Sequence, residues 1–272
     1  MATALSVNLN KIALIRNSRE GSYPDIVEHG KICLAAGADG ITVHPRPDQR
    51  HIRIGDIKPL GQLCRQWSLQ DPHKNIEFNI EGNPFANACD DYPGFIALAI
   101  AACPDQVTLV PDSNEQLTSD HGFDLHTVAD KLRPIIQQMK DIGARVSLFM
   151  NPDPEQISLA HSIGANRIEF YTGPYASAYK AAHSNNKNIS ITEQQHLQAR
   201  LQKQFDKYQK AASHANTIGL GINAGHDLNL DNLALFLRIP NILEVSIGHA
   251  LTVDAIKMGM SNAVGQYHKI CQ

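Results

Sequence analysis

Short apolar runs alternate with longer amphipathic stretches along most of the chain. Eight of these runs are rich in β-branched residues, end in polar residues and lie at about 4–8, 40–44, 76–81, 106–111, 145–150, 166–171, 219–223 and 243–247. Continuous apolar runs of this length are typical of strands buried on both faces of a parallel sheet. Eight strands separated by helices favour an α/β fold closed into a single (β/α)8 TIM barrel with additional helices. An open doubly wound sheet is the alternative.

Helical patterns fill most of the intervals between the predicted strands. They cover Pro24–Ala36, Asp124–Ile142 and Pro154–Ile163, and glycine follows each of them closely, as expected of a left-handed C-cap. The sequence therefore predicts repeated strand–helix units that end on a glycine.

The segment from about 174 to 216 is longer than one barrel helix requires. Residues 183–190 are polar and predict an exposed loop, and Thr192–Asn216 predicts a long helix that starts with a capping box formed by Thr192 and Gln195. We expect one catalytic domain over residues 1–272, with an inserted or extended helical segment around 174–216.

Composition narrows the class of protein. The chain has 272 residues, of which 43% are hydrophobic, and a formal net charge of −3, so no overall basic field recruits nucleic acid or an anionic membrane. The longest apolar run, Phe95–Cys103, is far shorter than the roughly 20 residues of a spanning helix. The start of the sequence lacks a secretory pattern, and five scattered cysteines are typical of reduced thiols. We expect a cytoplasmic protein.

Polar side chains follow the predicted strands, where the barrel fold places its active sites. They are Asn8, His44, Glu81, Thr108, Asn151, Glu169, Asn223, His226, Ser246 and His249. Each alone is compatible with an ordinary surface or core residue. Because the strand ends of a barrel meet at one rim, their coincidence predicts an active site there.

Two features indicate phosphate binding. Small residues in Asn223–His226 and Ile247–Ala250 follow the seventh and eighth strands, whose loops are the usual phosphate cradle of this fold. The segment after His44 carries Arg46 and Arg50, whose guanidinium groups suit bidentate binding of phosphate. A solvated polar loop is the alternative for that segment.

Several motifs carry a resemblance to a known family. The most specific are Gly37-Ala-Asp-Gly-Ile-Thr-Val-His44, Asn79-Ile-Glu81-Gly82, Ile168-Glu169, Asn223-Ala-Gly-His226 and Ile247-Gly-His249-Ala250. Over nearly its whole length the chain resembles the pyridoxine 5′-phosphate synthase family. The resemblance implies a barrel that uses neither cofactor nor metal and assembles as a homo-octamer. It also implies a reaction that joins 3-amino-2-oxopropyl phosphate to 1-deoxy-D-xylulose 5-phosphate, giving pyridoxine 5′-phosphate, phosphate and water.

The resemblance also implies roles for individual residues. His44 and Glu81 match the proton acceptors of the family, His226 matches its proton donor, and Glu169 matches a residue that stabilises transition states. Positions that contact the amino-ketone phosphate are matched by Asn8, Asp227, Gly248 and His249. Positions that contact the deoxyxylulose phosphate are matched by Arg19, Arg46, His51 and Thr118, and the arginine at position 19 is expected to reach a neighbouring subunit's site.

The chain departs from the family pattern just after Asn8. Where the best-known members carry Asp-His, this sequence has Asn10-Lys11. An amide can still bond a sugar hydroxyl and an ammonium can still pair with phosphate, so we expect Asn10 and Lys11 to contact substrate. An altered phospho-sugar substrate is the alternative at this edge of the site.

Residues 112–122 form a polar stretch after the fourth strand, and we interpret it as a lid that excludes water. Three other functions stay open from the residues alone. A lysine-based aldolase would need a lysine near the rim, where Lys11 is the nearest. A metal-dependent hydrolase would use the histidines. A barrel that binds phosphorylated ketones without turnover would need no catalysis.

Overall fold

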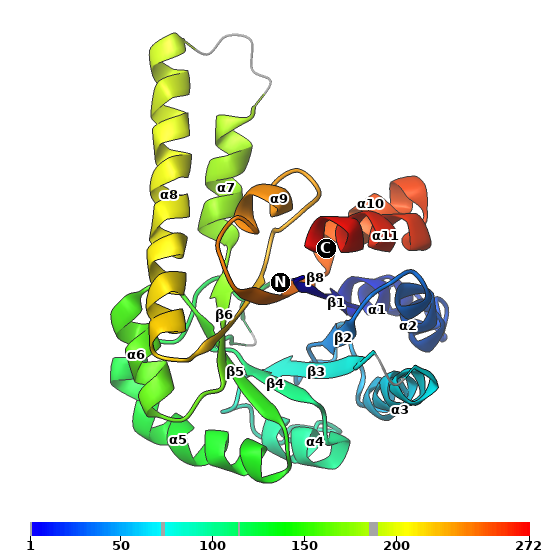
Figure 1. The fold of residues 1–272 in the computed structure, drawn as a ribbon. Coiled ribbons are helices and arrows are strands. Elements are labelled where there is room, and N and C mark those ends of the chain that lie inside the picture. Colours follow the sequence, from blue (N-terminus) through cyan, green and yellow to red (C-terminus); the bar gives the residue numbers. More distant parts are fainter. Residues whose placement is uncertain (1, 72–73, 114, 185–189) are drawn as a thin grey trace.

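The structure of the protein is a computed structural model that describes residues 2–71, 74–113, 115–184 and 190–272 (Figure 1). Eight strands pair in parallel in chain order, and β1 pairs with β8 to close a barrel. The strands are β1 Ala4–Asn8, β2 Gly40–Val43, β3 Glu77–Gly82, β4 Gln106–Leu109, β5 Arg145–Met150, β6 Arg167–Tyr171, β7 Gly221–Gly225 and β8 Ile242–Ile247. The predicted barrel is confirmed, and the open sheet is wrong.

Helices surround the barrel and follow its strands (Figure 1). They are α1 Asn10–Asn17, α2 Ile26–Ala35, α3 Ile54–Gln70, α4 Phe95–Ala102, α5 Leu125–Asp141, α6 Pro154–Ser162, α7 Gly173–Ala182, α8 Ile191–Thr217, α9 Leu233–Phe236, α10 His249–Met258 and α11 Met260–Cys271. The patterns that predicted α2, α5, α6 and α8 are confirmed to within two residues at either end. Most of the longest apolar run forms α4, which packs against α3 and α5 and places the Phe95 ring over Gly82 of β3.

The predicted capping box of the long helix is wrong. Helix α8 begins at Ile191, and its N-cap is Ser190, whose hydroxyl accepts the backbone N–H of Glu193 at 3.1 Å. Thr192 and Gln195 therefore lie inside the first turns of the helix. Of the loop predicted over 183–190, residues 185–189 lie outside the described residues.

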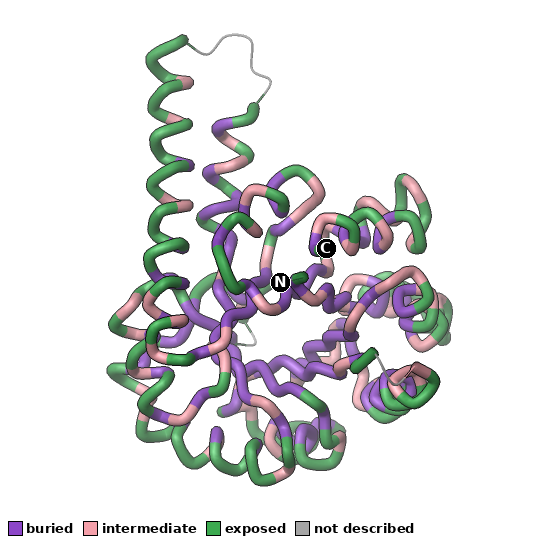
Figure 2. The backbone as a smooth tube through the Cα atoms, in the orientation of Figure 1, coloured by how far each residue is buried: buried purple, intermediate pink, exposed green. Residues whose placement is uncertain are grey.

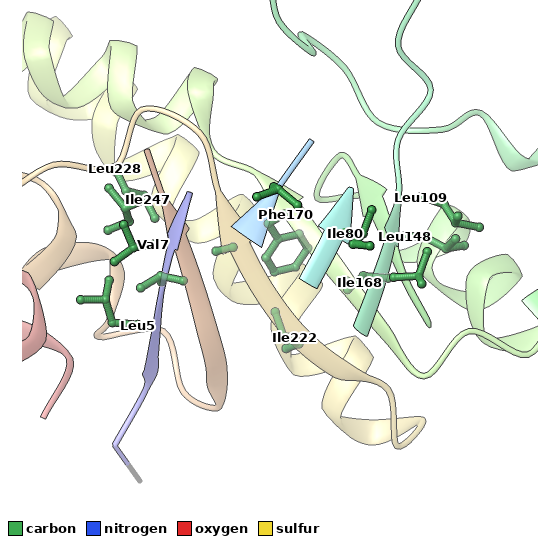
Figure 3. Packing of buried hydrophobic residues seen from close by; sticks show 14 of the residues in the cluster. Leu5, Val7, Ile80, Leu109, Leu148, Ile168, Phe170, Ile222, Leu228 and Ile247 are labelled. Carbon is green, nitrogen blue, oxygen red and sulfur yellow. The ribbon is translucent and has the colours of Figure 1, made fainter. Parts of the chain in front are cut away.

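The apolar side of each strand faces the surrounding helices. Figure 3 shows Leu5, Val7 and Ile247 together on the neighbouring strands β1 and β8, and all three are buried. Alternate residues of a strand point to opposite faces, so the residues between them must face into the barrel. The hydrophobic core is therefore a ring between the strands and the helices, which Figure 2 shows as a buried centre with an exposed outer surface.

The interior of the barrel is polar. The Gln106 amide of β4 donates to the Glu244 carboxylate of β8 at 3.2 Å, although these strands are not neighbours, so the contact crosses the barrel. Arg167 bonds the same carboxylate at 3.3 Å. Because buried polar groups are costly without partners, this network fixes how the strands meet across the interior.

Helices α7 and α8 lie side by side and extend beyond the barrel (Figure 1). Most of the outer part of α8 is exposed, as Figure 2 shows. This pair corresponds to the helical segment expected around 174–216. In the described part of the chain no helix is both long enough and apolar enough to cross a membrane.

Candidate active site

A cavity of about 390 Å³ opens at the C-terminal ends of the strands. Residues from seven strand ends or the loops after them line it, and nearly every residue expected at the site is among them. These are Asn8, Asn10, Lys11, His44, Arg46, His51, Glu81, Thr118, Glu169, His226, Asp227, Gly248 and His249. Among the residues that the resemblance matched to family roles, Arg19 is the exception, because it lies exposed just after α1 and does not line this cavity. Of the other polar residues expected at the strand ends, Thr108, Asn151 and Asn223 do not line it.

Glu81 and His44 form the centre of the cavity wall. Both are buried, and the Nδ1 atom of His44 lies 3.8 Å from Oε2 of Glu81. Burial raises the pKa of Glu81 to about 7, against the opposing effect of His44. A carboxyl group with this pKa exchanges protons readily near neutrality, as general acid–base catalysis requires.

Glu169 lies on β6 with only 2% of its surface exposed. Burial raises its pKa well above the ordinary value, and the carboxylates of Glu81 and Glu244 raise it further. Gly225 on the neighbouring strand makes room for it, since a Cβ atom there would lie 2.2 Å from Oε1 of Glu169. Its surroundings therefore favour the protonated form of a carboxyl group held at a fixed place, a form that can donate a hydrogen bond.

His226 follows β7 in a left-handed backbone conformation, with φ of 78°, which is rare for a residue with a side chain. The Thr172 hydroxyl contacts the carbonyl oxygens of Gly225 and His226 and holds this turn in place. The imidazole packs against Phe149, with ring centroids 4.8 Å apart. Burial lowers the pKa of His226 to about 4, so the ring is neutral at pH 7.

Arg46 and His51 come from the loop after β2, and both are buried. The backbone N–H of Ile52 donates to Nδ1 of His51 at 2.9 Å, which leaves the proton on Nε2. Burial lowers the pKa of His51 to about 3. Arg46 donates to the backbone carbonyls of Ser113 and Leu117 in the loop after β4. The loop predicted as a lid is thus attached to a guanidinium group of the site.

Helix α1 anchors the loop after β2. Arg16 is buried and donates to both carboxylate oxygens of Asp56, at 2.6 and 2.9 Å, and to the carbonyl of His51 at 3.0 Å. Asn17 donates to the same carbonyl at 2.7 Å. His51 is therefore held through its own backbone.

The N-terminus of α10 lines the cavity through Gly248, His249 and Ala250. Backbone N–H groups in the first turn of a helix attract anions. Lys11 lines the same cavity, and its charge contributes to the lowered pKa values of His51 and His226. This side of the cavity therefore combines a lysine with a helix N-terminus.

Besides the substrate contact expected from the sequence, Asn10 has a partner within the protein. Its Oδ1 atom accepts the backbone N–H of His44 at 2.9 Å. Its own backbone N–H donates to Oδ1 of Asn8 at 3.0 Å. The amide thus links the end of β1 to the residue that carries the imidazole.

Sequence reasoning missed two residues near the chemistry. Tyr171 lines the cavity at the end of β6, and its ring meets that of His226 at a centroid distance of 5.6 Å. Asp112 lies directly behind the cavity wall, 3.2 Å from Nε2 of His44. It directly follows Pro111, so its position after the fourth strand was the available signal. Thr108 and Asn223, by contrast, are buried and bonded inside the barrel.

The lysine-based aldolase and the metal-dependent hydrolase each require particular residues, which can be compared with those of the cavity. Lys11 is the only lysine among the described residues that line it, and Glu169 occupies the strand on which an aldolase would carry its lysine. Among the described residues, no three or more His, Cys, Asp or Glu side chains are placed together to hold a metal ion. The cysteines at 33, 64, 89, 103 and 271 are unbridged thiols.

A protein family and several known proteins match nearly the whole length of the chain. The family described as "Pyridoxal phosphate biosynthesis protein PdxJ" matches residues 5–272. A pyridoxine 5′-phosphate synthase of Xanthomonas axonopodis pv. citri is 48% identical over 268 residues, which cover 98% of this chain and 96% of the relative. A protein of the same name from Albidiferax ferrireducens is 45% identical, with the same two shares covered.

Solved structures resemble the fold at much lower identity. A tryptophan synthase from M. tuberculosis superposes with a TM-score of 0.58 at 12% identity, covering 99% of this chain and 93% of that one. A 4-hydroxy-2-oxoglutarate aldolase superposes with a TM-score of 0.56 at 10% identity, covering 99% and 94%. At these identities the likeness concerns the fold alone.

Proposed function

The chain belongs to the PdxJ family of pyridoxal phosphate biosynthesis proteins, and on that premise we propose that it is a pyridoxine 5′-phosphate synthase. It joins 3-amino-2-oxopropyl phosphate to 1-deoxy-D-xylulose 5-phosphate and forms the pyridine ring of vitamin B6, with phosphate and water as the other products. The observation that carries the proposal is the convergence of Glu81, His44, Glu169 and His226 on one cavity in a chain that matches the family over its length.

Glu81 and His44 act as proton acceptors in this proposal. The two substrates condense with each other through an amine and a ketone, so the protein supplies acids and bases rather than a covalent lysine. Ring formation then requires removal of protons from carbon and loss of water. A buried carboxylate with a pKa of about 7 beside an imidazole suits those steps.

Glu169 and His226 act as a hydrogen-bond donor and a proton donor in this proposal. A neutral Glu169 donates a hydrogen bond to an oxygen that gains negative charge in the transition state. His226 is neutral while the cavity is empty. The negative charges of two bound phosphate groups favour its protonated form, and the imidazolium then serves as proton donor.

Two regions of the cavity bind the two phosphate groups. The amino-ketone phosphate lies at the N-terminus of α10 with Gly248, His249, Asp227 and Asn8 around it. The deoxyxylulose phosphate lies against Arg46 and His51, with Thr118 from the loop after β4. Asn10 and Lys11 line the same cavity; in this proposal Asn10 bonds a sugar hydroxyl and Lys11 pairs with a phosphate.

The loop at 112–122, of which residue 114 lies outside the described residues, closes as a lid over the bound substrates. Arg46 holds it through two carbonyls, and Arg50 donates to the Gln116 carbonyl at 3.0 Å. A phosphate that binds Arg46 competes with those carbonyls and changes how the loop is held. Limited proteolysis tests this, because the loop is expected to be cut at a different rate when both substrate analogues are bound. Equal rates would contradict the lid.

In this proposal each chain acts as one catalytic domain in the cytoplasm. The chains assemble as a homo-octamer, in which Arg19 completes a neighbouring subunit's site. The exposed position of Arg19, outside the cavity of its own chain, supports its role at a neighbouring site. Complementation tests it: neither Arg19→Ala nor His44→Ala alone is active, but mixed assemblies regain activity because the His44→Ala subunit donates its arginine. No recovery in verified mixed assemblies would place Arg19 outside the reaction.

The central experiment supplies purified protein with deoxyxylulose phosphate and freshly generated amino-oxopropyl phosphate, and follows pyridoxine phosphate by fluorescence and mass spectrometry. We expect product from the wild-type protein and a loss of about 10²- to 10⁴-fold in Glu81→Gln and His44→Ala. Glu155→Gln, on the exposed surface of α6, is the matched control. No product from intact substrates would refute the function, and Asn10→Asp with Lys11→His would then test an altered substrate.

A further inference from the structure

A second cavity of about 380 Å³ lies on the other side of His44 and Arg46. These two residues line both cavities and so form the wall between them. Asp112 and Asn83 line the second cavity, and among the described residues they do not line the first. Asp112 therefore reaches His44 from the side opposite to the substrates.

Asp112 is the third residue after β4 and is only 5% exposed. Its Oδ2 atom lies 3.2 Å from Nε2 of His44 and 2.9 Å from an Nη atom of Arg46. Asn83 donates from its side chain to the backbone carbonyl of Asp112 at 2.6 Å. The end of β3 therefore holds the backbone of Asp112, while its carboxylate faces two residues that follow β2.

Resting on the function proposed above, we propose that Asp112 is a positioning residue for His44. Its carboxylate keeps the proton of the neutral imidazole on Nε2 and leaves Nδ1, the nitrogen that faces Glu81, as the basic atom. When Nδ1 takes a proton from a substrate carbon, the electron pair of the C–H bond stays on the substrate. The imidazolium that forms is stabilised by the carboxylate behind it.

The charges around His44 favour this arrangement. Burial alone would raise the pKa of Asp112, but His44 and Arg46 together hold it below its ordinary value, so the group is an anion at neutral pH. The titratable and charged groups that face His44 are Glu81 from β3, Asp112 after β4, His226 after β7, and Arg46 and His51 from its own loop. Of the two carboxyl groups, Asp112 is the one whose pKa is lowered.

Asp112 also pairs with Arg46, which we assign to the deoxyxylulose phosphate. Removing the carboxylate therefore has two opposite effects. It weakens the base His44, and it frees the Arg46 guanidinium to bind phosphate more strongly. A residue with a purely structural role would not separate catalysis from binding in this way.

The test compares Asp112→Asn, Asp112→Glu and the wild-type protein, with Asp130→Asn on the exposed surface of α5 as the matched control. Two measurements are made on each. One is kcat and KM for deoxyxylulose phosphate across pH. The other is independent of activity: the pH dependence of His44 modification by diethyl pyrocarbonate, which reacts with the neutral imidazole, read by peptide mass spectrometry. Asp112→Ser replaces Asp112→Asn if the latter does not fold.

We expect Asp112→Asn to lower kcat by about 10- to 100-fold while KM stays unchanged or falls. The midpoint of His44 modification moves to lower pH than in the wild-type protein, since an opposite charge is lost beside the ring. Asp112→Glu keeps the charge and restores most of kcat. A raised KM with unchanged kcat, or an unmoved modification midpoint, overturns the proposal. If the wild-type protein makes no product, the proposed function fails and the modification midpoint alone decides the role of Asp112.

Discussion

Gly225 offers the sharpest test of how closely the site must be held. A Cβ atom added at this position would lie 2.2 Å from Oε1 of Glu169 and 3.3 Å from its Cδ atom. The backbone of Gly225 does not occupy the left-handed region, so Gly225→Ala causes no strain of its own there. The substitution therefore acts through the displacement of one carboxyl group.

The size of that displacement follows from the contact. An ordinary van der Waals contact begins at 3.4 Å, so the oxygen must retreat by 3.4 − 2.2 = 1.2 Å. A misplacement of about 1 Å in a catalytic group costs roughly 10²-fold in rate, or about 3 kcal/mol of barrier. Crowding a packed interior costs about 1–3 kcal/mol of folding stability in addition.

The assay measures kcat and the thermal midpoint for Gly225→Ala and for Gly265→Ala. Gly265 lies within α11, where an added Cβ atom meets nothing within 4 Å, so the control makes the same chemical change without a contact. We expect the control to keep full activity and to gain a little stability from alanine's helix propensity. If Gly225→Ala retained kcat within about threefold while folded, the position of Glu169 would not matter to catalysis as we reason.

Three further predictions follow from the buried charges. In urea denaturation, Arg16→Met should lower the free energy of unfolding by about 3–5 kcal/mol, because it leaves the Asp56 carboxylate, 11% exposed, without its guanidinium partner. The control Lys31→Met breaks an exposed ion pair and should lower it by less than about 1 kcal/mol. Equal losses in the two variants would contradict the reasoning. Because Glu81 accepts protons only when ionised, kcat/KM should rise with pH up to its pKa of about 7, and a flat profile from pH 5.5 to 7.5 would exclude it as the base. The pKa of His226 falls from 6.5 to about 4 on folding, so the contribution of its neutral imidazole to stability is complete above pH 6.5 and is lost as pH falls toward 4. Between pH 6.5 and pH 4, His226→Asn should therefore lose less free energy of unfolding than the wild-type protein, by at most about 3 kcal/mol.

The fold could be predicted from the sequence because each unit repeats the same signals. A β-branched run, a helical pattern and a capping glycine mark most strands, and the strand predicted at 4–8 is β1 as found. Strand β7 was placed two residues early, since Gly219 and Leu220 continue the apolar pattern but belong to the turn before it. The start of α8 was misplaced because serine and threonine at 190 and 192 give equivalent capping signals.

The site was predictable where a residue stands at a strand end, and less so where three-dimensional contacts decide. Glu81 lies at the end of β3 and His44 directly follows β2, so the fold alone brings them together. Asn10 bonds the backbone of His44, which depends on how β1 and β2 are staggered. Asp112 faces away from the substrates, and only the packing behind the wall reveals its contact with His44.

The polar interior of the barrel has a consequence for how the chain reaches its fold. Strands such as β3, β5 and β7 bury their apolar faces against helices close to them in sequence, whereas β1 packs against α11 and the Gln106–Glu244 bond joins residues 138 positions apart. Contacts of such long sequence separation form slowly, because a large loop must close first. We expect the strand–helix units to gain protection early in a pulsed hydrogen-exchange experiment and the β1–β8 seam to gain it last, so that the molecule passes through an open sheet before it becomes a ring.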